Sequence, residues 1–165
     1  MAEPVKVSLT WQEQLFAAQA GCMRRISAIA RRRTEPYLTP KGELWGIDIE
    51  SSGAEAAVAK GLGMYWQAVL VNPEEANGDV SGIEVRSTPR KNGRLIIHDR
   101  DKNDSAFVLV RGVFPDYELV GWIFGKDAKN SEFLFSGDGR PAYFVPETSL
   151  RCISELPINL SGAEL

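Results

Sequence analysis

The chain has 165 residues, of which 44% are hydrophobic and 25% are charged, proportions that are typical of one globular domain and that exclude a disordered or fibrous protein. Its net charge of −3 argues against a protein that coats nucleic acid non-specifically, because such proteins are strongly basic. Two cysteines and one histidine are too few for a disulfide framework or a zinc site, so we expect any metal to be held by oxygen ligands.

Membrane association is not expected from the sequence. No segment approaches the roughly 20 consecutive apolar residues of a membrane-spanning helix, and the first residues lack the apolar segment of a signal peptide. We therefore expect a cytoplasmic protein. Residues 1–41 hold seven Lys and Arg against three Asp and Glu, whereas residues 42–165 hold twelve against nineteen. We predict a single domain, 1–165, with a basic N-terminal helical arm at 1–40 and a core at 41–165.

The first predicted element is a helix that begins after Thr10. Thr10 and Glu13 form the pattern of a capping box, in which a hydroxyl and a carboxylate satisfy each other's backbone N–H groups. Apolar residues then recur at spacings of three and four, as on one face of a helix: Leu15, Ala18, Cys22, Ile26 and Ile29. Arginines lie in the same helix and at its end, among them Arg24, Arg31 and Arg32. They either stabilise the helix C-terminus or contact phosphates, and both interpretations stay open.

The rest of the chain predicts one more helix and then a series of strands. Ser52 is expected to cap the second helix, which ends near Gly61–Gly63. Segments rich in β-branched and aromatic residues follow, with a hairpin turn at Asn92–Gly93. The predicted strands lie at 66–71, 82–88, 94–98, 106–112 and 117–123. This order indicates an α+β fold, with two helices packed on one side of a mostly antiparallel or mixed sheet.

Carboxylates are the residues most suited to chemistry in this chain. There is no P-loop, no dinucleotide-binding glycine motif and no nucleophile elbow, and His98 fits a surface histidine better than a general base. Glu55 is predicted in the first turn of the second helix, Asp79 in a turn before a strand, and Glu84 within that strand. Glu84 and Arg86 are expected on the same face of the strand, because side chains alternate.

These residues have a functional and a structural interpretation. Carboxylates beside a cation can hold divalent ions and stabilise the charge that develops during hydrolysis of a phosphodiester. In the structural interpretation, Glu55 completes a capping box with Ser52 and Asp79 only shapes a turn. Glu84 and Arg86 would then form a solvated ion pair of little energetic weight. Spacing alone does not decide between the two interpretations.

Four blocks of the sequence carry a resemblance to known proteins. They are GAEAAVAKGLGMYW, DVSGIEVRST, RLIIHDRDKNDSAFVLVRG and YELVGWIFGKDAK. Together they resemble a group of small phage and prophage proteins regarded as nuclease-like, over about residues 10–155. The order of the acidic residues resembles the PD-(D/E)XK, or restriction-endonuclease-like, nuclease superfamily. The resemblance implies a restriction-endonuclease-like core, a DNA substrate and the cytoplasm of a bacterial host. Nucleases of this fold often pair as homodimers to cut both strands, but the sequence leaves the oligomeric state open.

The resemblance assigns roles to individual residues. Glu55, Asp79 and Glu84 would be metal ligands for Mg²⁺ or Mn²⁺, and Arg86 would take the position of the motif lysine. Because arginine stays protonated, Arg86 would stabilise charge without serving as a general base. Only four residues separate Asp79 from Glu84, fewer than the superfamily commonly has.

Lysines outside the motif add two further predictions. Lys60 and Lys126 are candidates to replace the missing motif lysine in space. Lys126 and Lys129, in the basic segment GKDAK, are expected to contact DNA together with Arg24, Arg31 and Arg32.

The leading hypothesis is a Mg²⁺-dependent nuclease that acts on DNA. The alternative is a catalytically inactive module of the same fold that binds DNA or a protein partner, which the Glu-x-Arg pattern and the acidic net charge favour. A third hypothesis is a phage structural or anti-defence protein whose carboxylates only solvate its surface. Convergence of Glu55, Asp79 and Glu84 within one metal-coordination shell would favour the enzyme.

Overall fold

The computed structural model of the chain describes residues 3–32, 40, 42–68, 78–137 and 141–158. The helices in these residues are α1 (Trp11–Ala30), α2 (Leu44–Gly61) and the single turn α3 (Gly125–Ala128). The strands are β1 (Val5–Ser8), β2 (Ile83–Thr88), β3 (Leu95–His98), β4 (Ala106–Val113), β5 (Asp116–Phe124), β6 (Leu134–Phe135) and β7 (Ala142–Val145). None of the described helices has the length and apolarity needed to cross a lipid bilayer.

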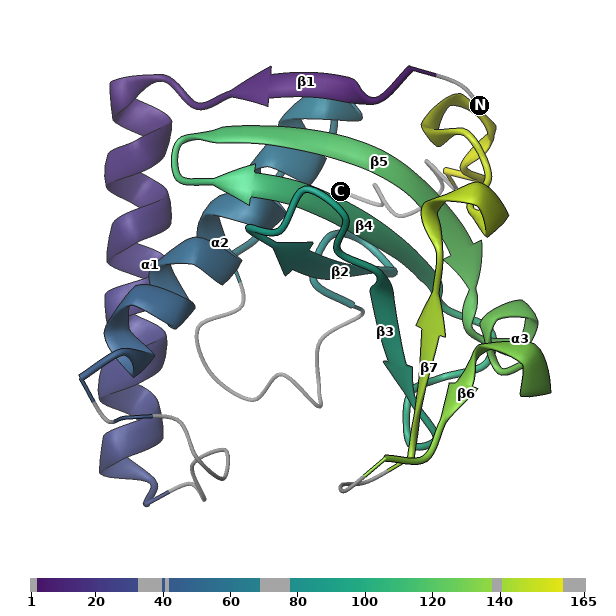
Figure 1. The fold of residues 1–165 in the computed structure, drawn as a ribbon. Coiled ribbons are helices and arrows are strands. Elements are labelled where there is room, and N and C mark those ends of the chain that lie inside the picture. The colour runs from purple at the N-terminus through teal and green to yellow at the C-terminus, as the bar shows by residue number, and fades with distance from the viewer. Residues whose placement is uncertain (1–2, 33–39, 41, 69–77, 138–140, 159–165) are drawn as a thin grey trace.

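Two sheets organise the described residues. The larger sheet has the strand order β1-β5-β4-β2, in which β2 and β4 run parallel and the other neighbours run antiparallel. The smaller sheet, β3-β7-β6, is antiparallel. Figure 1 shows the succession of layers: α1, then α2, then the larger sheet, then the smaller sheet. The predicted α+β class with a mixed sheet is therefore confirmed.

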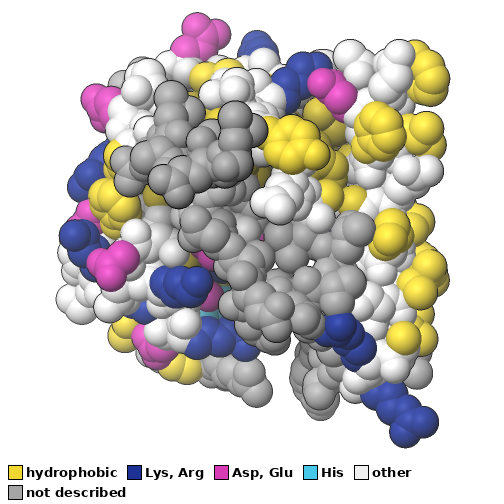
Figure 2. Space-filling model, turned by 180° about the vertical axis from the view of Figure 1, so that it is seen from behind, with side chains coloured by type: hydrophobic (Ala, Val, Ile, Leu, Met, Phe, Trp, Pro, Cys, Tyr) yellow, Lys and Arg dark blue, Asp and Glu magenta, His cyan; other side chains and the backbone are white. Residues whose placement is uncertain are grey.

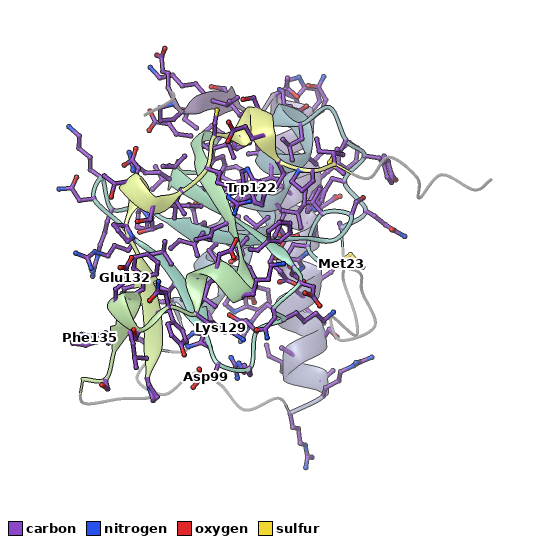
Figure 3. All side chains as sticks on the ribbon, turned by 90° about the vertical axis from the view of Figure 1, so that its right-hand side faces the viewer. Met23, Asp99, Trp122, Lys129, Glu132 and Phe135 are labelled. Carbon is purple, nitrogen blue, oxygen red and sulfur yellow. The ribbon has the colours of Figure 1, made fainter. Side chains whose placement is uncertain are left out.

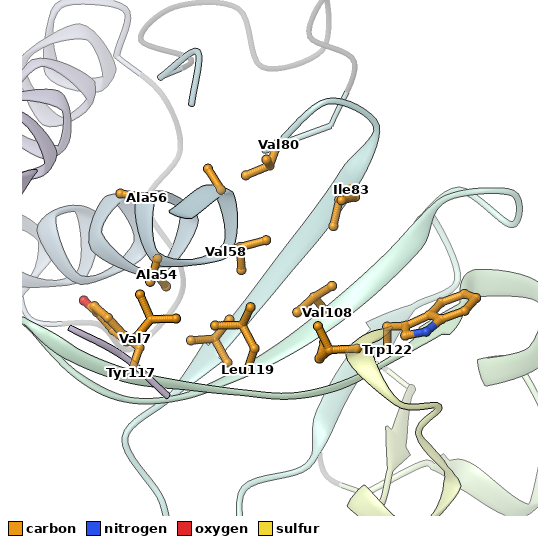
Figure 4. Close-up of a cluster of buried hydrophobic side chains, with 14 of the residues drawn as sticks. Val7, Ala54, Ala56, Val58, Val80, Ile83, Val108, Tyr117, Leu119 and Trp122 are labelled. Atoms are coloured by element: carbon orange, nitrogen blue, oxygen red, sulfur yellow. The ribbon is translucent and has the colours of Figure 1, made fainter. Parts of the chain in front are cut away.

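Each face of the larger sheet has its own hydrophobic core. On one face, Val58 and other small apolar residues of α2 pack against Val108 and Leu119 (Figure 4). On the opposite face, Phe107 and Leu109 pack with residues of the smaller sheet such as Leu95. Because successive residues of β4 point to opposite faces and both faces are covered, its first five residues are all buried.

Helix α1 begins as predicted but presents a different face to the core. Its capping box is present: the Thr10 Oγ1 accepts from the Glu13 N–H, and a Glu13 carboxylate oxygen accepts from the Thr10 N–H at 2.7 Å. The buried residues of α1 are Ala17, Ala20, Gly21 and Arg25. The large apolar residues of the predicted stripe, including Leu15, Ile26 and Ile29, are exposed. The helix packs on α2 through its small residues, which allow a close approach of the two backbones.

The predicted start of the second helix is wrong. Helix α2 begins at Leu44, eight residues before Ser52, so Ser52 lies in the helix interior and Glu55 is not in a first turn. The Ser52 side chain is fully buried, and its hydroxyl has no hydrogen-bond partner among the described residues. The Ser-x-x-Glu pattern is misleading here because burial of α2 between α1 and the sheet, rather than a side-chain cap, stabilises this helix.

Three local predictions also need correction. The turn at Asn92–Gly93 does not join a hairpin, because β2 pairs with β4 and β3 pairs with β7 in the other sheet. Residues 66–68 of the predicted strand 66–71 are irregular, and 69–71 lie outside the described residues. The segment GKDAK, predicted as a basic loop, contains the helical turn α3. The strands predicted at 82–88, 106–112 and 117–123 are confirmed as β2, β4 and β5.

A pair of glycine substitutions tests the close packing of the two helices. A Cβ added at Gly21 would lie 2.6 Å from the Ile49 Cα, whereas one added at Gly46 would meet nothing within 4 Å. We expect Gly21→Ala to lower the free energy of unfolding by about 1–3 kcal/mol through overpacking, despite the better helix propensity of alanine. The control Gly46→Ala should raise it by up to about 1 kcal/mol. Urea unfolding measures both, and a stabilising Gly21→Ala would contradict the packing.

Candidate functional site

The turn that precedes β2 brings Asp79 next to this strand. Backbone hydrogen bonds link Asp79 and Val80 to Ile83, and Gly78 and Gly82 adopt positive φ angles of 69° and 89°. Ser81 also has a positive φ of 45°, a conformation that is uncommon for a residue with a side chain. The chain reverses so tightly that the Asp79 Oδ2 accepts a hydrogen bond of 2.8 Å from the Val85 N–H. The short separation between Asp79 and Glu84 therefore places the two residues side by side.

Glu84 and Arg86 lie on the same face of β2, as predicted. Their side chains approach to 3.7 Å between Glu84 Oε2 and Arg86 Nη1. Arg86 also donates to the Asp101 carboxylate at 3.2 Å, and its guanidinium lies 5.1 Å from the centre of the Phe107 ring. Because Phe107 belongs to the core beneath the smaller sheet, Glu84 and Arg86 point to the face of the larger sheet opposite α2.

Asp79 is electrostatically coupled to the two other predicted carboxylates. Burial raises the pKa of Glu84, and the negative charge of Asp79 raises it further, while the Arg86 guanidinium opposes the shift. Burial also raises the pKa of Glu55, where Arg24 opposes the shift and Asp79 again adds to it. Asp79 therefore lies close enough to interact with Glu55 on one side and with Glu84 on the other.

Glu55 is held by a buried ion pair. Its two carboxylate oxygens accept from the two terminal nitrogens of Arg24, each at 2.6 Å, and the Trp66 indole N–H donates to Oε2 at 3.3 Å. The Glu55 side chain is 6% exposed and that of Arg24 19% exposed. The neighbouring Arg25 donates from Nε to Asp48 at 2.6 Å, so two adjacent arginines of α1 are paired with carboxylates of α2. Glu55 neither caps Ser52 nor presents a free oxygen to a ligand in this arrangement.

The three carboxylates do not form one compact shell in the described residues, because Glu55 approaches from the α2 side of the sheet and Glu84 from the other. Within that part of the chain, no group of three or more His, Cys, Asp and Glu side chains is arranged to hold a metal ion. Asp79 and Glu84 remain as a pair of adjacent carboxylates. One or two carboxylates together with substrate phosphates are the ligands that Mg²⁺ commonly takes, so this donor pair fits Mg²⁺ chemically. Its occupation by a metal stays a prediction.

Two residues of the 99–105 loop that the sequence analysis did not select join this cluster. Asp101 accepts from Arg86, as described above, and also from the His98 backbone N–H at 2.9 Å. Lys102 lies close enough to Glu84 for its ammonium to lower the pKa of that carboxyl, although burial and Asp79 have the larger, opposite effect. Asp101, Lys102 and Gly82 line an open polar hollow of about 610 Å³ beside the cluster. The only sequence signal was the density of charges in the segment DRDKND.

The predicted lysines lie elsewhere or are engaged. Lys129, labelled with Asp99 in Figure 3, donates to the backbone oxygens of Asp99 and Asp101 and to the Asn103 side chain, at 2.6–2.8 Å, so its ammonium is bound by the 99–105 loop. Lys60 donates to Glu13 and to the Ser8 oxygen at the other end of α2. Lys126 is exposed, with its ammonium 5.4 Å from the centre of the Phe124 ring.

Of the three arginines predicted to contact DNA, one forms a structural ion pair and two are exposed. Arg24 is the partner of Glu55 and joins α1 to α2, so its contacts are structural in this state. Arg31 and Arg32 are exposed at the C-terminal end of α1, where Arg32 has a φ of 50°. A role of Arg31 and Arg32 in DNA binding stays a prediction.

Removal of Arg24 tests the ion pair. Arg24→Ala leaves the buried Glu55 carboxylate unpaired, so we expect a loss of about 3–5 kcal/mol in the free energy of unfolding at neutral pH. Because the folded-state pKa of Glu55 lies above its ordinary value of 4.5, its ionisation destabilises the folded chain. The deficit should therefore be present at pH 7 and shrink as the pH falls below the folded-state pKa, when Glu55 becomes protonated.

Urea unfolding at pH 7 and near pH 4.5 measures the free energy of unfolding of Arg24→Ala and of the wild type. Arg32→Ala, at an exposed position, serves as the control. Addition of Glu55→Gln to Arg24→Ala should recover part of the loss at pH 7, because no charge is then left buried without a partner. An equal deficit at both pH values, together with no recovery in the double variant, would contradict the assignment.

Comparison with known proteins gives no match for this chain: no protein-family model, no curated protein and no solved structure is significantly similar to it. The resemblance to restriction-endonuclease-like nucleases therefore rests on the sequence blocks and on the acidic residues. The geometry of the cluster at β2 is therefore the main evidence on function.

Proposed function

We propose that the protein is a phosphodiesterase that cleaves DNA, with a restriction-endonuclease-like core, in the cytoplasm of a bacterial host. The observation that carries the proposal is the pair of adjacent carboxylates, Asp79 and Glu84, flanked by the cations Arg86 and Lys102 at the edge strand of the larger sheet. Asp79 and Glu84 repel each other, and two cations and an open polar hollow lie beside them. Binding of a phosphodiester together with a divalent ion would stabilise this arrangement of charges.

The roles of the residues follow from their charges and partners. Asp79 and Glu84 would hold Mg²⁺ or Mn²⁺, which when bound polarises a phosphoryl oxygen and activates water. Arg86 would contact the phosphate, since its guanidinium is kept in place by Asp101 and by the Phe107 ring. Lys102, which is exposed and lines the hollow, would supply a second positive charge in addition to that of Arg86. Glu55 would act indirectly, through its contact with Arg24 and its charge beside Asp79.

A second function is favoured by one specific observation. Both oxygens of Glu55 are engaged by Arg24, so the third predicted ligand is not available in this arrangement. A module of this fold that binds DNA without cleaving it would retain the cations and need no metal. Binding and cleavage therefore have to be measured separately, on plasmid and single-stranded DNA, with Mg²⁺, Mn²⁺ or EDTA. Binding without cleavage under every condition would assign the binding function and reject the nuclease.

Glu84→Gln tests the carboxylate pair. We expect it to lower the cleavage rate more than about 100-fold, because it removes one of two proposed metal ligands. The metal-free variant should nevertheless be as stable as the wild type or more stable at pH 7, since the ionised Glu84 is partly buried and repelled by Asp79. This gain should fade as the pH falls through the folded-state pKa of Glu84, which lies above the ordinary value, because the wild-type carboxyl then becomes protonated.

The matched control is Glu132→Gln, which neutralises an exposed glutamate outside the cluster (Figure 3). It should change neither the cleavage rate nor the melting temperature. Unchanged cleavage by Glu84→Gln would reject the proposed site.

The two cations are tested by substitutions that keep or remove the charge. Arg86→Ala should slow cleavage about 100- to 1,000-fold, the usual effect of removing one group that stabilises transition-state charge, whereas Arg86→Lys should retain most of the activity or exceed it. Lys102→Met should also slow cleavage, and Lys102→Arg should restore much of it. Lys91→Met, at an exposed position in the turn between β2 and β3, serves as the control. Wild-type rates in both Arg86→Ala and Lys102→Met would leave these residues without a catalytic role.

A further inference from the structure

Helix α1 exposes an unusually large apolar surface. Six large apolar side chains of this helix are between 49% and 69% exposed: Trp11, Leu15, Phe16, Met23, Ile26 and Ile29. We call them the α1 face. Figure 2 shows hydrophobic side chains gathered along the edge of the molecule that α1 forms. Single exposed apolar residues are ordinary, but a continuous apolar row along an entire helix marks an interaction surface.

The α1 face contains no charged residue. At about 100° per residue, its six members span an arc of about 140° around the helix axis. The neutral Gln12 and Gln19 fall within the same arc. The charged residues of α1 all lie outside it, and Arg24 and Arg25 are paired with α2. The α1 face is therefore apolar, and the side-chain amide of Gln19 lies near its middle.

The α1 face has an approximate internal two-fold symmetry. Its members form three pairs, Trp11 with Ile29, Leu15 with Ile26, and Phe16 with Met23, and each pair is centred within half a residue of position 20. Gln19 lies near the middle of the face, both along the helix and around it. In a two-fold interface, a residue i that contacts j of the partner requires that j contact i in return. A sequence arranged in this way is self-complementary when two copies run antiparallel.

We infer that the α1 face binds a second copy of the chain, through an antiparallel pair of α1 helices related by a two-fold axis at Gln19. In this pair Trp11 packs against Ile29 of the partner subunit, and Leu15 against the partner's Ile26. The two Gln19 amides meet at the axis, where each can donate to and accept from the other. This inference is independent of the proposed nuclease function.

The size of the face suits a dimer. A helix of 20 residues is about 30 Å long, and exposed aromatic and aliphatic side chains of this number offer on the order of 600 Å² per copy. Two copies would bury roughly 1,200 Å², the lower end of the range for specific protein interfaces. A lipid surface is a poorer occupant, because helices that lie on membranes present Lys and Arg beside the apolar face, whereas Arg24 and Arg25 are paired within the chain.

The oligomeric state tests the inference. We expect sedimentation or light scattering to give a dimer for the wild type at micromolar concentration, and a monomer for Leu15→Glu/Ile26→Glu, in which each glutamate would face another across the axis. Val113→Glu, at a position that is 54% exposed in β4, is the matched control and should stay dimeric. Because all three sites are exposed, circular dichroism should show unchanged helix content. A monomeric wild type, a dimeric double variant, or a monomer that binds anionic phospholipid vesicles would overturn the inference.

Cross-linking tests the orientation of the helices. Single cysteines are placed by Leu15→Cys in one preparation and by Ile26→Cys in another, both in a chain in which Cys22 and Cys152 are replaced by serine. Oxidation of the mixture should give mainly a disulfide between the two variants, because positions 15 and 26 are opposite each other in the antiparallel pair. Efficient cross-linking within each preparation alone would indicate parallel helices and would overturn the two-fold arrangement.

Discussion

Gly21 of α1 lies so close to the backbone of Ile49 in α2 that a methyl group at this position would overlap it. This approach is possible because the residues of α1 that face α2 are small, and it determines how the rest of α1 is oriented. With Ala17, Ala20 and Gly21 turned inward, the large apolar residues must point outward. The same rotation directs Arg24 and Arg25 toward Glu55 and Asp48. The close contact between Gly21 and Ile49 thus accounts both for the ion pair of Glu55 with Arg24 and for the exposed α1 face.

The carboxylates of the candidate site differ in how their charge is compensated. Glu55 is almost fully buried, and a charge in that position is tolerated only with a partner of good geometry, which the two-pronged contact with Arg24 supplies. Among the described residues, Asp79 and Glu84 have no ion pair of this two-pronged kind: Asp79 accepts from the Val85 N–H, and Arg86 is 3.7 Å from Glu84 and is shared with Asp101. Within the described residues, Arg86 and Lys102 therefore offset the repulsion between Asp79 and Glu84 only in part. A cation or a cation-bridged phosphate would gain most by binding at this pair, which is the physical basis of the proposed function.

At the end of the larger sheet, on β2, the side chains of Glu84 and Arg86 are partly exposed, at 21% and 30%. Among the described strands, β2 pairs with β4 alone, and the tight turn at 78–83 adds Asp79 at the beginning of β2. The 99–105 loop reaches the same edge because it joins β3 of the smaller sheet to β4, the strand paired with β2. Three hydrogen bonds from the Lys129 ammonium stabilise this loop, from which Asp101 contacts Arg86. A lysine predicted to contact DNA thus has a structural role in organising the site.

The sequence by itself determined those features that depend on neighbouring residues. The capping box at Thr10, the strands β2, β4 and β5, the shared face of Glu84 and Arg86, and the α+β class all follow from local hydrogen bonding or from alternation along a strand. Tertiary structure alone decided which strands pair, where α2 begins, and which face of α1 is buried. These features depend on contacts between residues far apart in the chain, and spacing carries no information about them. Asp101 and Lys102 could not be chosen from the sequence for the same reason: only the meeting of the two sheets brings them to Glu84, because the polar segment DRDKND is otherwise indistinguishable from an ordinary solvated loop.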